Sequence, residues 1–354
     1  MSQPRPIDLW YTVCPVPAAS SLAIARGEFE GAFAGSDATL ANIRAHADRR
    51  VREAHYDQSQ PRLFREGGNI PPIWSRSVGR NLRVIGLSWI EHYSRLLALP
   101  GSGINSAADL RGKRLALLRR PNDPVDYPRA TALRAYTEAL ASAGLGPEDV
   151  TFVDVTIDEP LVAQPPEEGA LSSSLFSSRS TKRRQGPELR ALLTGKVDVI
   201  HGYTQNLELE WLLDAQVVVD VGRLPDIAQR INNISPIVFT VRGELLDERP
   251  DLVARYLEQA IRTARWAREN QGEAKRLIAR DSSIAEELVD LAYSPQVAAV
   301  LEPSLDPKLI DLLENQKNFL LRWGFIPNDF DVREWIAPGP LLLAHHRLET
   351  QRAT

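Results

Sequence analysis

The single cysteine of the chain lies in a short motif near the N-terminus, and three further polar elements follow it in order. Cys14 begins the sequence CPVP (14–17), and His55, Arg65 and GGNIPP (67–72) come after it. A thiol can act as a nucleophile or as a proton donor, and a histidine beside it can take up or return the proton. An arginine offers a planar fork that matches the two oxygens of a carboxylate or a sulfinate. Together these residue types predict thiol chemistry on a small anion.

Each of these residues also has an ordinary structural interpretation. A lone cysteine is most often a small buried hydrophobe, and a loop arginine is most often solvated. Gly67 and Gly68 can simply form a turn, or they can present backbone N–H groups to an anion, because glycine allows close approach. Cys14 follows a predicted strand and precedes a predicted helix, so the helix dipole and a nearby cation would favour the thiolate. This position favours a reactive thiol over a packed one.

The surrounding segments predict the elements that must position these residues. Residues 7–13 are rich in β-branched and aromatic side chains and predict a strand, and residues 18–29 have the apolar spacing of a helix. Residues 36–54 are rich in Ala and Arg and predict a second helix. Residues 55–72 contain paired prolines and paired glycines and predict a loop. The histidine and the arginine of the motif are therefore expected on one loop.

Strands and helices alternate along the rest of the chain. The strands are expected at 82–90, 95–99, 114–118, 150–157, 195–200, 217–221 and 237–241. The helices are expected as a short one between Ser106 and Gly112 and longer ones at 129–143, 187–193 and 250–270. Alternation of this kind predicts βαβ units and an α/β fold.

Length, charge and cysteine content limit the possible functions. A chain of 354 residues predicts one large or two medium domains. Its 42 Lys and Arg against 46 Asp and Glu give a net charge of −4, which argues against a nucleic-acid partner. We expect a cytoplasmic protein without a membrane segment, because the chain has neither a long apolar run nor a signal peptide. One cysteine excludes an internal disulfide and a paired-cysteine metal site.

Residues 158–186 differ in composition from the rest of the chain. The segment is first rich in Pro and Glu, then rich in Ser, and finally basic. Loops of this length in compact domains are commonly lids or linkers. One hypothesis is a lid that places Leu171, Leu175 and Phe176 over a bound substrate. The alternative is a disordered excursion at the surface.

Three stretches of the chain resemble the periplasmic-binding-protein-like (type II) fold. They are residues 106–117, 191–200 and 234–269, and their order and spacing are similar to those of nitrate-, sulfonate- and taurine-binding proteins. The resemblance implies an α/β fold of two lobes with a cleft between them. We expect the first lobe to comprise 1–98 and 215–354, and the second lobe to comprise 99–214.

The N-terminal motifs resemble the aromatic sulfinate desulfinases. Shared features are a cysteine followed by PVP, a histidine and an arginine ten residues apart, and a Gly-Gly-x-Ile-Pro-Pro sequence. The resemblance implies a cofactor-free, metal-free, monomeric enzyme that cleaves the C–S bond of an aryl or alkenyl sulfinate and releases sulfite. Its catalytic residues would be Cys14, His55 and Arg65. Its substrate contacts would include Gly67, Gly68 and Thr12, which stands where the family has a serine.

Two positions depart from the family pattern. Thr131 stands where the family has an aromatic residue, and HGYTQN (201–206) replaces an apolar stretch that contains a tryptophan. Thr131, His201 and Tyr203 are therefore predicted substrate contacts in a more polar pocket. We expect a smaller or more polar sulfinate than biphenyl sulfinate. The alternative for 201–206 is an ordinary polar turn after a strand.

Two other functions are compatible with parts of the sequence. A solute-binding protein for a sulfonate-like anion would use the same cleft without turnover, but it explains neither CPVP nor the missing export signal. An enzyme of the thiamine-pyrimidine synthase type would share the fold, but it uses a cysteine-rich iron motif, which a chain with one cysteine lacks.

Overall fold

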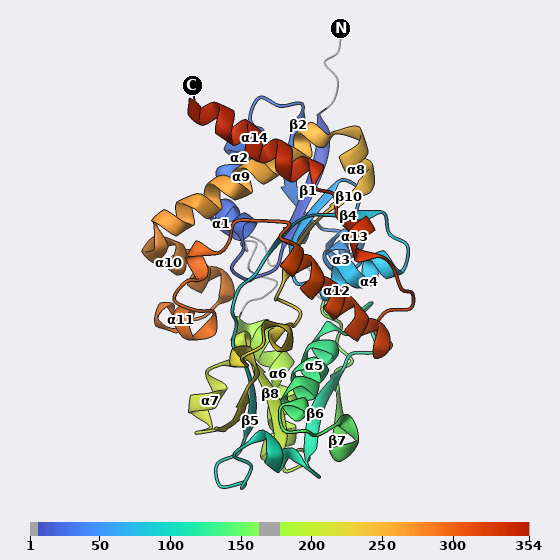
Figure 1. The fold of residues 1–354 in the computed structure, drawn as a ribbon, viewed down its shortest axis with the longest axis vertical. Coiled ribbons are helices and arrows are strands. Elements are labelled where there is room, and N and C mark those ends of the chain that lie inside the picture. The colour runs from blue at the N-terminus through green and yellow to red at the C-terminus, as the bar shows by residue number, and fades with distance from the viewer. Residues whose placement is uncertain (1–5, 163–177, 354) are drawn as a thin grey trace.

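The computed structural model describes residues 6–162 and 178–353 and shows two α/β lobes, one above the other in Figure 1. Each lobe is built on a five-stranded sheet, with the strand orders β2-β1-β3-β10-β4 and β7-β6-β8-β5-β9. Both sheets are mixed, and helices pack against them. The expected α/β fold of two lobes is therefore confirmed.

The sheet of the first lobe carries the N-terminal motif. Its strands are β1 (Ile7–Val13), β2 (Ala38–Asn42), β3 (Leu63–Gly67), β4 (Leu82–Ser88) and β10 (Ile237–Arg242). Strand β1 runs parallel to β2 and β3, and β10 runs antiparallel to β3 and β4. Strand β3 is the middle strand, and all five of its residues are buried.

The sheet of the second lobe takes in two strands that the expected boundaries left in the first lobe. Its strands are β5 (Ser94–Ala98), β6 (Arg114–Arg119), β7 (Thr151–Thr156), β8 (Val199–Tyr203) and β9 (Gln216–Asp220). Strand β5 pairs with both β8 and β9. The sheets therefore divide the chain before β5 and after β9, not at residues 98 and 215, because these two strands find their hydrogen-bond partners in the second sheet.

Helices surround both sheets. In the first lobe they are α1 (Ala19–Ala25), α2 (Glu28–Phe33), α3 (Arg49–Asp57), α4 (Ile70–Ser77), α8 (Gly243–Glu248), α9 (Pro250–Glu269), α10 (Gln271–Ser282), α11 (Val289–Ala292), α12 (Pro307–Arg322), α13 (Val332–Trp335) and α14 (Gly339–Ala353). In the second lobe they are α5 (Tyr127–Ala141), α6 (Ser178–Leu193) and α7 (Leu209–Leu212). The helix expected at 250–270 is confirmed as α9, whose apolar residues at helical spacing form its buried face.

The predictions for residues 36–72 were wrong in part. Residues 38–42 form strand β2 instead of a helix, because pairing with β1 outweighs the helix propensity of alanine. The expected loop 55–72 contains the end of α3, the strand β3 and the start of α4. Pro71 and Pro72 lie in the first turn of α4, where a missing N–H costs no helical hydrogen bond.

Helix α12 lies where the two lobes meet in Figure 1. Leu313 and Leu320 of this helix share one apolar cluster with Ile73 of the first lobe and Ala130 of the second. The buried Gln316 adds a polar link, since it accepts a hydrogen bond from Arg134 of α5 at 2.8 Å and donates one to Asn69 at 3.1 Å. Packing and hydrogen bonds through α12 thus hold the lobes around the space between them.

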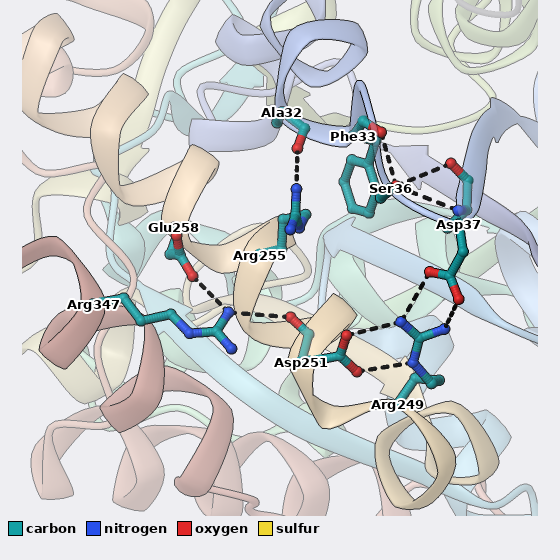
Figure 2. Close-up of polar contacts among 10 residues, drawn as sticks. Ala32, Phe33, Ser36, Asp37, Arg249, Asp251, Arg255, Glu258 and Arg347 are labelled. Carbon is teal, nitrogen blue, oxygen red and sulfur yellow. Dashed lines mark hydrogen bonds and ion pairs between the residues drawn. The ribbon is translucent and has the colours of Figure 1, made fainter. Parts of the chain in front are cut away.

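Ion pairs tie the outer helices of the first lobe together (Figure 2). Arg249 bonds to Asp37 at 2.9 Å and to Asp251 at 2.8 Å, so it joins the turn before β2 to the start of α9. Arg347 bonds to Glu258 at 2.9 Å and thereby fixes α14 on α9. These contacts position α9 and the C-terminal helix on the first lobe.

The lid expected over 158–186 falls mainly on residues 163–177, and Leu171, Leu175 and Phe176 lie outside the described residues. Its last part, from Ser178, belongs to α6. Among the helices that the structure describes, none combines the length and the apolar composition needed to cross a bilayer.

Candidate active site

Parallel pairing of β1 and β3 places the N-terminal motif on one face of the first sheet. Thr12 pairs with Arg65 in the register, and the N–H of Cys14 continues the pairing by donating to the carbonyl of Glu66 at 3.0 Å. Side chains two residues apart on a strand share a face, so Thr12 and Cys14 point the same way. A Cβ added at Gly67 would overlap Cys14 Sγ, so glycine at 67 makes room for the thiol.

The thiol lies between an imidazole and a guanidinium. Cys14 Sγ is 3.7 Å from His55 Nε2 and 3.6 Å from Arg65 Nη2. His55 and Arg65 are 3% and 1% exposed, whereas Cys14 is partly exposed. The three predicted catalytic residues are thus brought together, although β3 and α3 carry the arginine and the histidine instead of one loop.

Two residues besides the cysteine lie against His55. Thr12 Oγ1 lies 2.8 Å from His55 Nδ1, and Arg44 Nη2 lies 3.3 Å from Nε2. When the threonine hydroxyl donates to Nδ1, Nε2 carries the proton and can donate to the sulfur, which stabilises a thiolate. In that tautomer Arg44 does not donate to Nε2, because a guanidinium has only donors. Thr12 is fully buried and thus faces the imidazole, not the cavity wall where a substrate contact was expected.

Arg65 is fixed by hydrogen bonds that leave one amino group directed at the sulfur. Its Nε donates to the carbonyl of His55 at 2.9 Å, and its Nη1 donates to the carbonyl of Gly68 at 2.8 Å. Burial lowers the pKa of Arg65, and it also lowers the pKa of Arg44. Two desolvated cations near one thiol favour the binding of an anion there.

We expected the N-terminus of the helix after Cys14 to stabilise the thiolate, but the first turn of this helix, α1, bonds to a different group. The first-turn N–H of Ser20 in α1 donates to the Glu66 carboxylate at 2.8 Å. Glu66 points to the sheet face opposite Arg65, and burial raises its pKa. The charges near Cys14 are therefore the arginines, while α1 is capped by a buried carboxyl.

A cavity of about 120 Å³ opens at the thiol and is walled by both lobes. The first lobe and the segment that follows β9 contribute Cys14, Pro15, Val16, His55, Tyr56, Arg65, Gly68, Pro71, His92, Asn232, Asn233 and Ile234. The second lobe contributes Tyr93, Leu118, Arg120, Tyr127, Pro128, Thr131, Ala132, Leu161, Glu188, His201, Tyr203 and Thr204. The expected interlobe cleft is thus present, with the cysteine in its wall.

Four of the six predicted substrate contacts line this cavity, namely Gly68, Thr131, His201 and Tyr203. The hydroxyl of Thr131 donates to the Tyr127 carbonyl at 2.7 Å, within its own helix. His201 Nε2 lies 2.9 Å from Ser94 Oγ, and burial lowers the pKa of His201 to about 4, so its imidazole is neutral at pH 7. Gly67 packs on the thiol and, like Thr12, is not among the described lining residues.

Several further residues line or support the site. The stacked rings of Tyr56 and Tyr127, with centroids 6.0 Å apart, supply an aromatic wall. Arg44 and Glu188 are buried charges near the thiol and in the cavity wall. Glu188 and Arg44 were not predicted: Glu188 comes just after the unusual segment 158–186, and nothing in the sequence around Arg44 distinguishes it from the other arginines.

Metal binding has no obvious place in this cavity. Among the residues that the structure describes, no group of three or more His, Cys, Asp or Glu side chains could hold a metal ion. The polar groups at the thiol are an imidazole and two guanidiniums. Since a guanidinium has no lone pair to donate, this cluster is suited to an anion.

Comparison with known proteins gives similarity over almost the entire chain. A family model described as NMT1/THI5 like matches residues 73–164. The 2'-hydroxybiphenyl-2-sulfinate desulfinases of Rhodococcus erythropolis and Rhodococcus qingshengii are each 26% identical over 361 aligned residues, which cover 93% of this chain and 91% of the relative.

Solved structures agree with this similarity. The desulfurization enzyme DszB is 26% identical to this chain, with a TM-score of 0.74. Its cysteine-to-serine mutant in complex with biphenyl-2-sulfinic acid is 25% identical, with a TM-score of 0.76. Both alignments cover 96% of this chain and 99% of the other. The aliphatic sulphonate-binding protein SsuA of Escherichia coli shares the fold at 14% identity and a TM-score of 0.63, over 95% of this chain and 92% of that one. The resemblance inferred from the N-terminal motifs is therefore confirmed: the chain is a homologue of 2'-hydroxybiphenyl-2-sulfinate desulfinase on a periplasmic-binding-protein-like fold.

Proposed function

We propose that this protein is a cysteine-dependent desulfinase that cleaves the C–S bond of an aryl or alkenyl sulfinate and releases sulfite. The observation that carries the proposal is the position of Cys14 Sγ, 3.7 Å from His55 Nε2 and 3.6 Å from Arg65 Nη2, in the wall of a cavity of about 120 Å³. Homology to a sulfinate desulfinase supports it. In this proposal the enzyme acts as a cytoplasmic monomer and needs neither a metal nor a cofactor.

Substrate binding would begin with the two oxygens of the sulfinate group. Arg65 Nη2 is the part of the guanidinium directed at the thiol, because Nε and Nη1 donate to carbonyls. An anion bound there would bring its sulfur next to Cys14 Sγ and its carbon toward the aromatic wall of Tyr56 and Tyr127. Because these two hydrogen bonds already hold the guanidinium in place, its side chain loses less entropy when the anion binds.

In the nucleophilic route, the thiolate of Cys14 attacks the sulfinate sulfur and forms an S–S bond. The C–S bond breaks, and the proton on the His55 imidazolium goes to the carbon, so R–H leaves and a Cys–S–SO₂⁻ group remains. Water then adds to this group, which regenerates the thiol and releases HSO₃⁻. Over the whole cycle charge is conserved, because one sulfinate anion enters and one HSO₃⁻ leaves.

In the proton-transfer route, the thiol gives its proton to the substrate carbon. The C–S bond breaks and leaves R–H, SO₂ and the thiolate. Addition of water to SO₂ yields HSO₃⁻ and a proton, and His55 returns that proton to Cys14. The contacts of His55 with both Thr12 and Cys14 serve either route, because both need a proton moved at the thiol.

The cavity supports a substrate smaller or more polar than biphenyl sulfinate. His201, Glu188 and Thr204 bring polar groups to the wall of the second lobe, where the family pattern is apolar at 201–206. A large apolar second ring would desolvate these groups without pairing them, which is unfavourable.

The test is a panel of aryl and alkenyl sulfinates, assayed by the release of sulfite. Cys14→Ser should lower the turnover rate at least about 1,000-fold, since a serine hydroxyl is neither as acidic nor as nucleophilic as a thiol. The variant should still bind sulfinates in calorimetry, which separates lost chemistry from misfolding. Tight binding of sulfinates by the wild-type protein, with every ligand recovered unchanged, would instead indicate a solute-binding protein.

A further inference from the structure

The second lobe contributes a buried acid to the cavity wall that the proposed reaction does not use. Glu188 lies on α6, is 3% exposed and lines the cavity. Among the described residues, no arginine, lysine or histidine forms an ion pair with its carboxyl group. Arg120 lines the same wall, but it donates to Asp123 at 2.8 Å and to the carbonyl of Glu159 at 2.7 Å. A carboxylate buried without a cation is unfavourable, so burial keeps this carboxyl protonated until a cationic ligand compensates the charge.

One hydroxyl group in the same wall is also buried without a hydrogen-bond partner among the described residues. Thr204 lines the cavity and is 1% exposed, and its Oγ1 bonds to no other atom of the described protein. An unsatisfied buried hydroxyl is unfavourable. Thr204 and Glu188 thus place two polar groups without a described partner in the wall of the second lobe, which points to a ligand group that bonds to both.

The two walls of the cavity present ionisable groups of opposite kind. Arg65 places a guanidinium in the wall of the first lobe, and Glu188 places a carboxyl in the wall of the second lobe. His201 does not oppose a cation there, because burial lowers its pKa to about 4 and keeps it neutral. A ligand with an anion at one end and a cation at the other complements both walls.

We propose that the organic group of the substrate carries a basic nitrogen, and that Glu188 binds this nitrogen as an ammonium or a protonated heterocycle. The hydroxyl oxygen of Thr204, which also lines the cavity, would accept one of its remaining hydrogens. The proposal names a substrate class for the desulfinase reaction and rests on that proposed function for the anionic end. It distinguishes this protein from relatives whose named substrate has no cationic group.

Binding to the Cys14→Ser protein tests this subsite without requiring turnover. The probes are three para-substituted benzenesulfinates that carry an aminomethyl, a hydroxymethyl or a methyl group. Calorimetry should give a Kd at least 10-fold lower for the aminomethyl compound than for the methyl compound. Burial raises the pKa of Glu188 to about 8, so binding of the ammonium at pH 7 should also release a proton, which the buffer dependence of the heat detects.

Substitution of Glu188 assigns the preference to this residue. In the Cys14→Ser, Glu188→Gln protein, the Kd of the methyl compound divided by that of the aminomethyl compound should fall to about 2 or less. The control substitution in the same Cys14→Ser background is Glu287→Gln, at an exposed glutamate, and it should leave this ratio unchanged. A ratio near 1 in the parent, or a ratio that survives Glu188→Gln, overturns the proposal. So does equal affinity for the hydroxymethyl and aminomethyl compounds, which would assign a neutral donor. If the preference holds but the wild-type protein releases no sulfite, the desulfinase function fails and the subsite stands.

Discussion

Ionisable side chains on the outside of the first lobe form ion pairs, whereas two of those inside the cavity, Arg65 and Glu188, form none with the described residues. On the outside, Arg249 bonds to two carboxylates and Arg347 to a third, all of them in contact with solvent (Figure 2). Inside, Arg65 is 1% exposed and donates to two carbonyls and a thiol, and Glu188 is 3% exposed with no cation paired to it among the described residues. The outer charges neutralise one another, whereas the inner guanidinium and carboxyl remain available to a ligand.

The difference shows where charge is functional in this molecule. Solvent-exposed ion pairs contribute about 0–1 kcal/mol each and can be lost at little cost. A buried charge without a counter-ion costs several kcal/mol, so it persists only where carbonyls, a thiol or a ligand compensate it. Buried ionisable groups on the two walls therefore locate the site more reliably than the many paired charges at the surface.

The largest effect should be on stability and should come from Glu188. Its pKa is raised by burial to about 8, against 4.5 for an ordinary glutamate, so the folded state holds the proton more tightly than the unfolded state. Stability contributed by this group is present at low pH and is lost as the pH rises toward 8. Between pH 5 and pH 8 the loss should be about 3 kcal/mol.

Urea unfolding at both pH values measures this loss against a matched variant. Glu188→Gln cannot ionise, so its unfolding free energy should fall by about 3 kcal/mol less than that of the wild type over this interval. Any constant effect of the amide cancels in the difference. Parallel pH dependence of the two proteins would show that the carboxyl is hydrated or paired.

Arg65→Lys should have the next largest effect, on catalysis. Lysine keeps the positive charge but loses the planar fork, so it cannot hold both carbonyls and also direct a donor at the sulfur. We expect kcat/KM for sulfite release to fall about 100-fold, or about 2.7 kcal/mol.

The matched substitution at the surface is Arg249→Lys, which should change kcat/KM less than twofold. Circular dichroism of both variants checks that they are folded. Comparable activity losses in the two variants would contradict the distinction between inner and outer arginines.

Thr12→Val should have a moderate effect on the same reaction. The valine has nearly the shape of threonine but cannot bond to His55 Nδ1, which lies 2.8 Å from the hydroxyl. Loss of the preferred tautomer should lower kcat about 10-fold and shift the pH–rate profile, with KM little changed. Thr12→Ser should restore both, and a valine variant with an unaltered pH profile would assign Thr12 to packing alone.

The smallest effect should come from Arg347→Ala on the outer surface. Removal of its partly exposed ion pair with Glu258 should lower the unfolding free energy by about 0.5–1 kcal/mol, with sulfite release unchanged. The loss should diminish in 1 M NaCl, because salt screens the pair. A loss of activity would mean that α14 influences the cavity.

Much of the local structure could be predicted from the sequence. Residues 7–13 and 237–241 form strands because their β-branched and apolar side chains suit a buried sheet, and 250–269 form a helix because apolar residues recur at its period. In contrast, 63–67 were missed as a strand. Arg65 and Glu66 interrupt the apolar pattern there, and only pairing with β1 and β10 on either side explains why they are buried.

The sequence by itself determined which functional groups the site would contain: one thiol, the imidazole and guanidinium ten residues apart, and the glycines after them. Their chemistry follows from residue type, and their order revealed the relationship to the desulfinases. Only the tertiary structure decided which groups meet. The register of β1 and β3 puts Thr12, Cys14 and Arg65 on one face, and the second lobe brings Glu188 to the same cavity. Pairings between segments far apart in the chain control burial and charge, and they leave no periodic trace in the sequence.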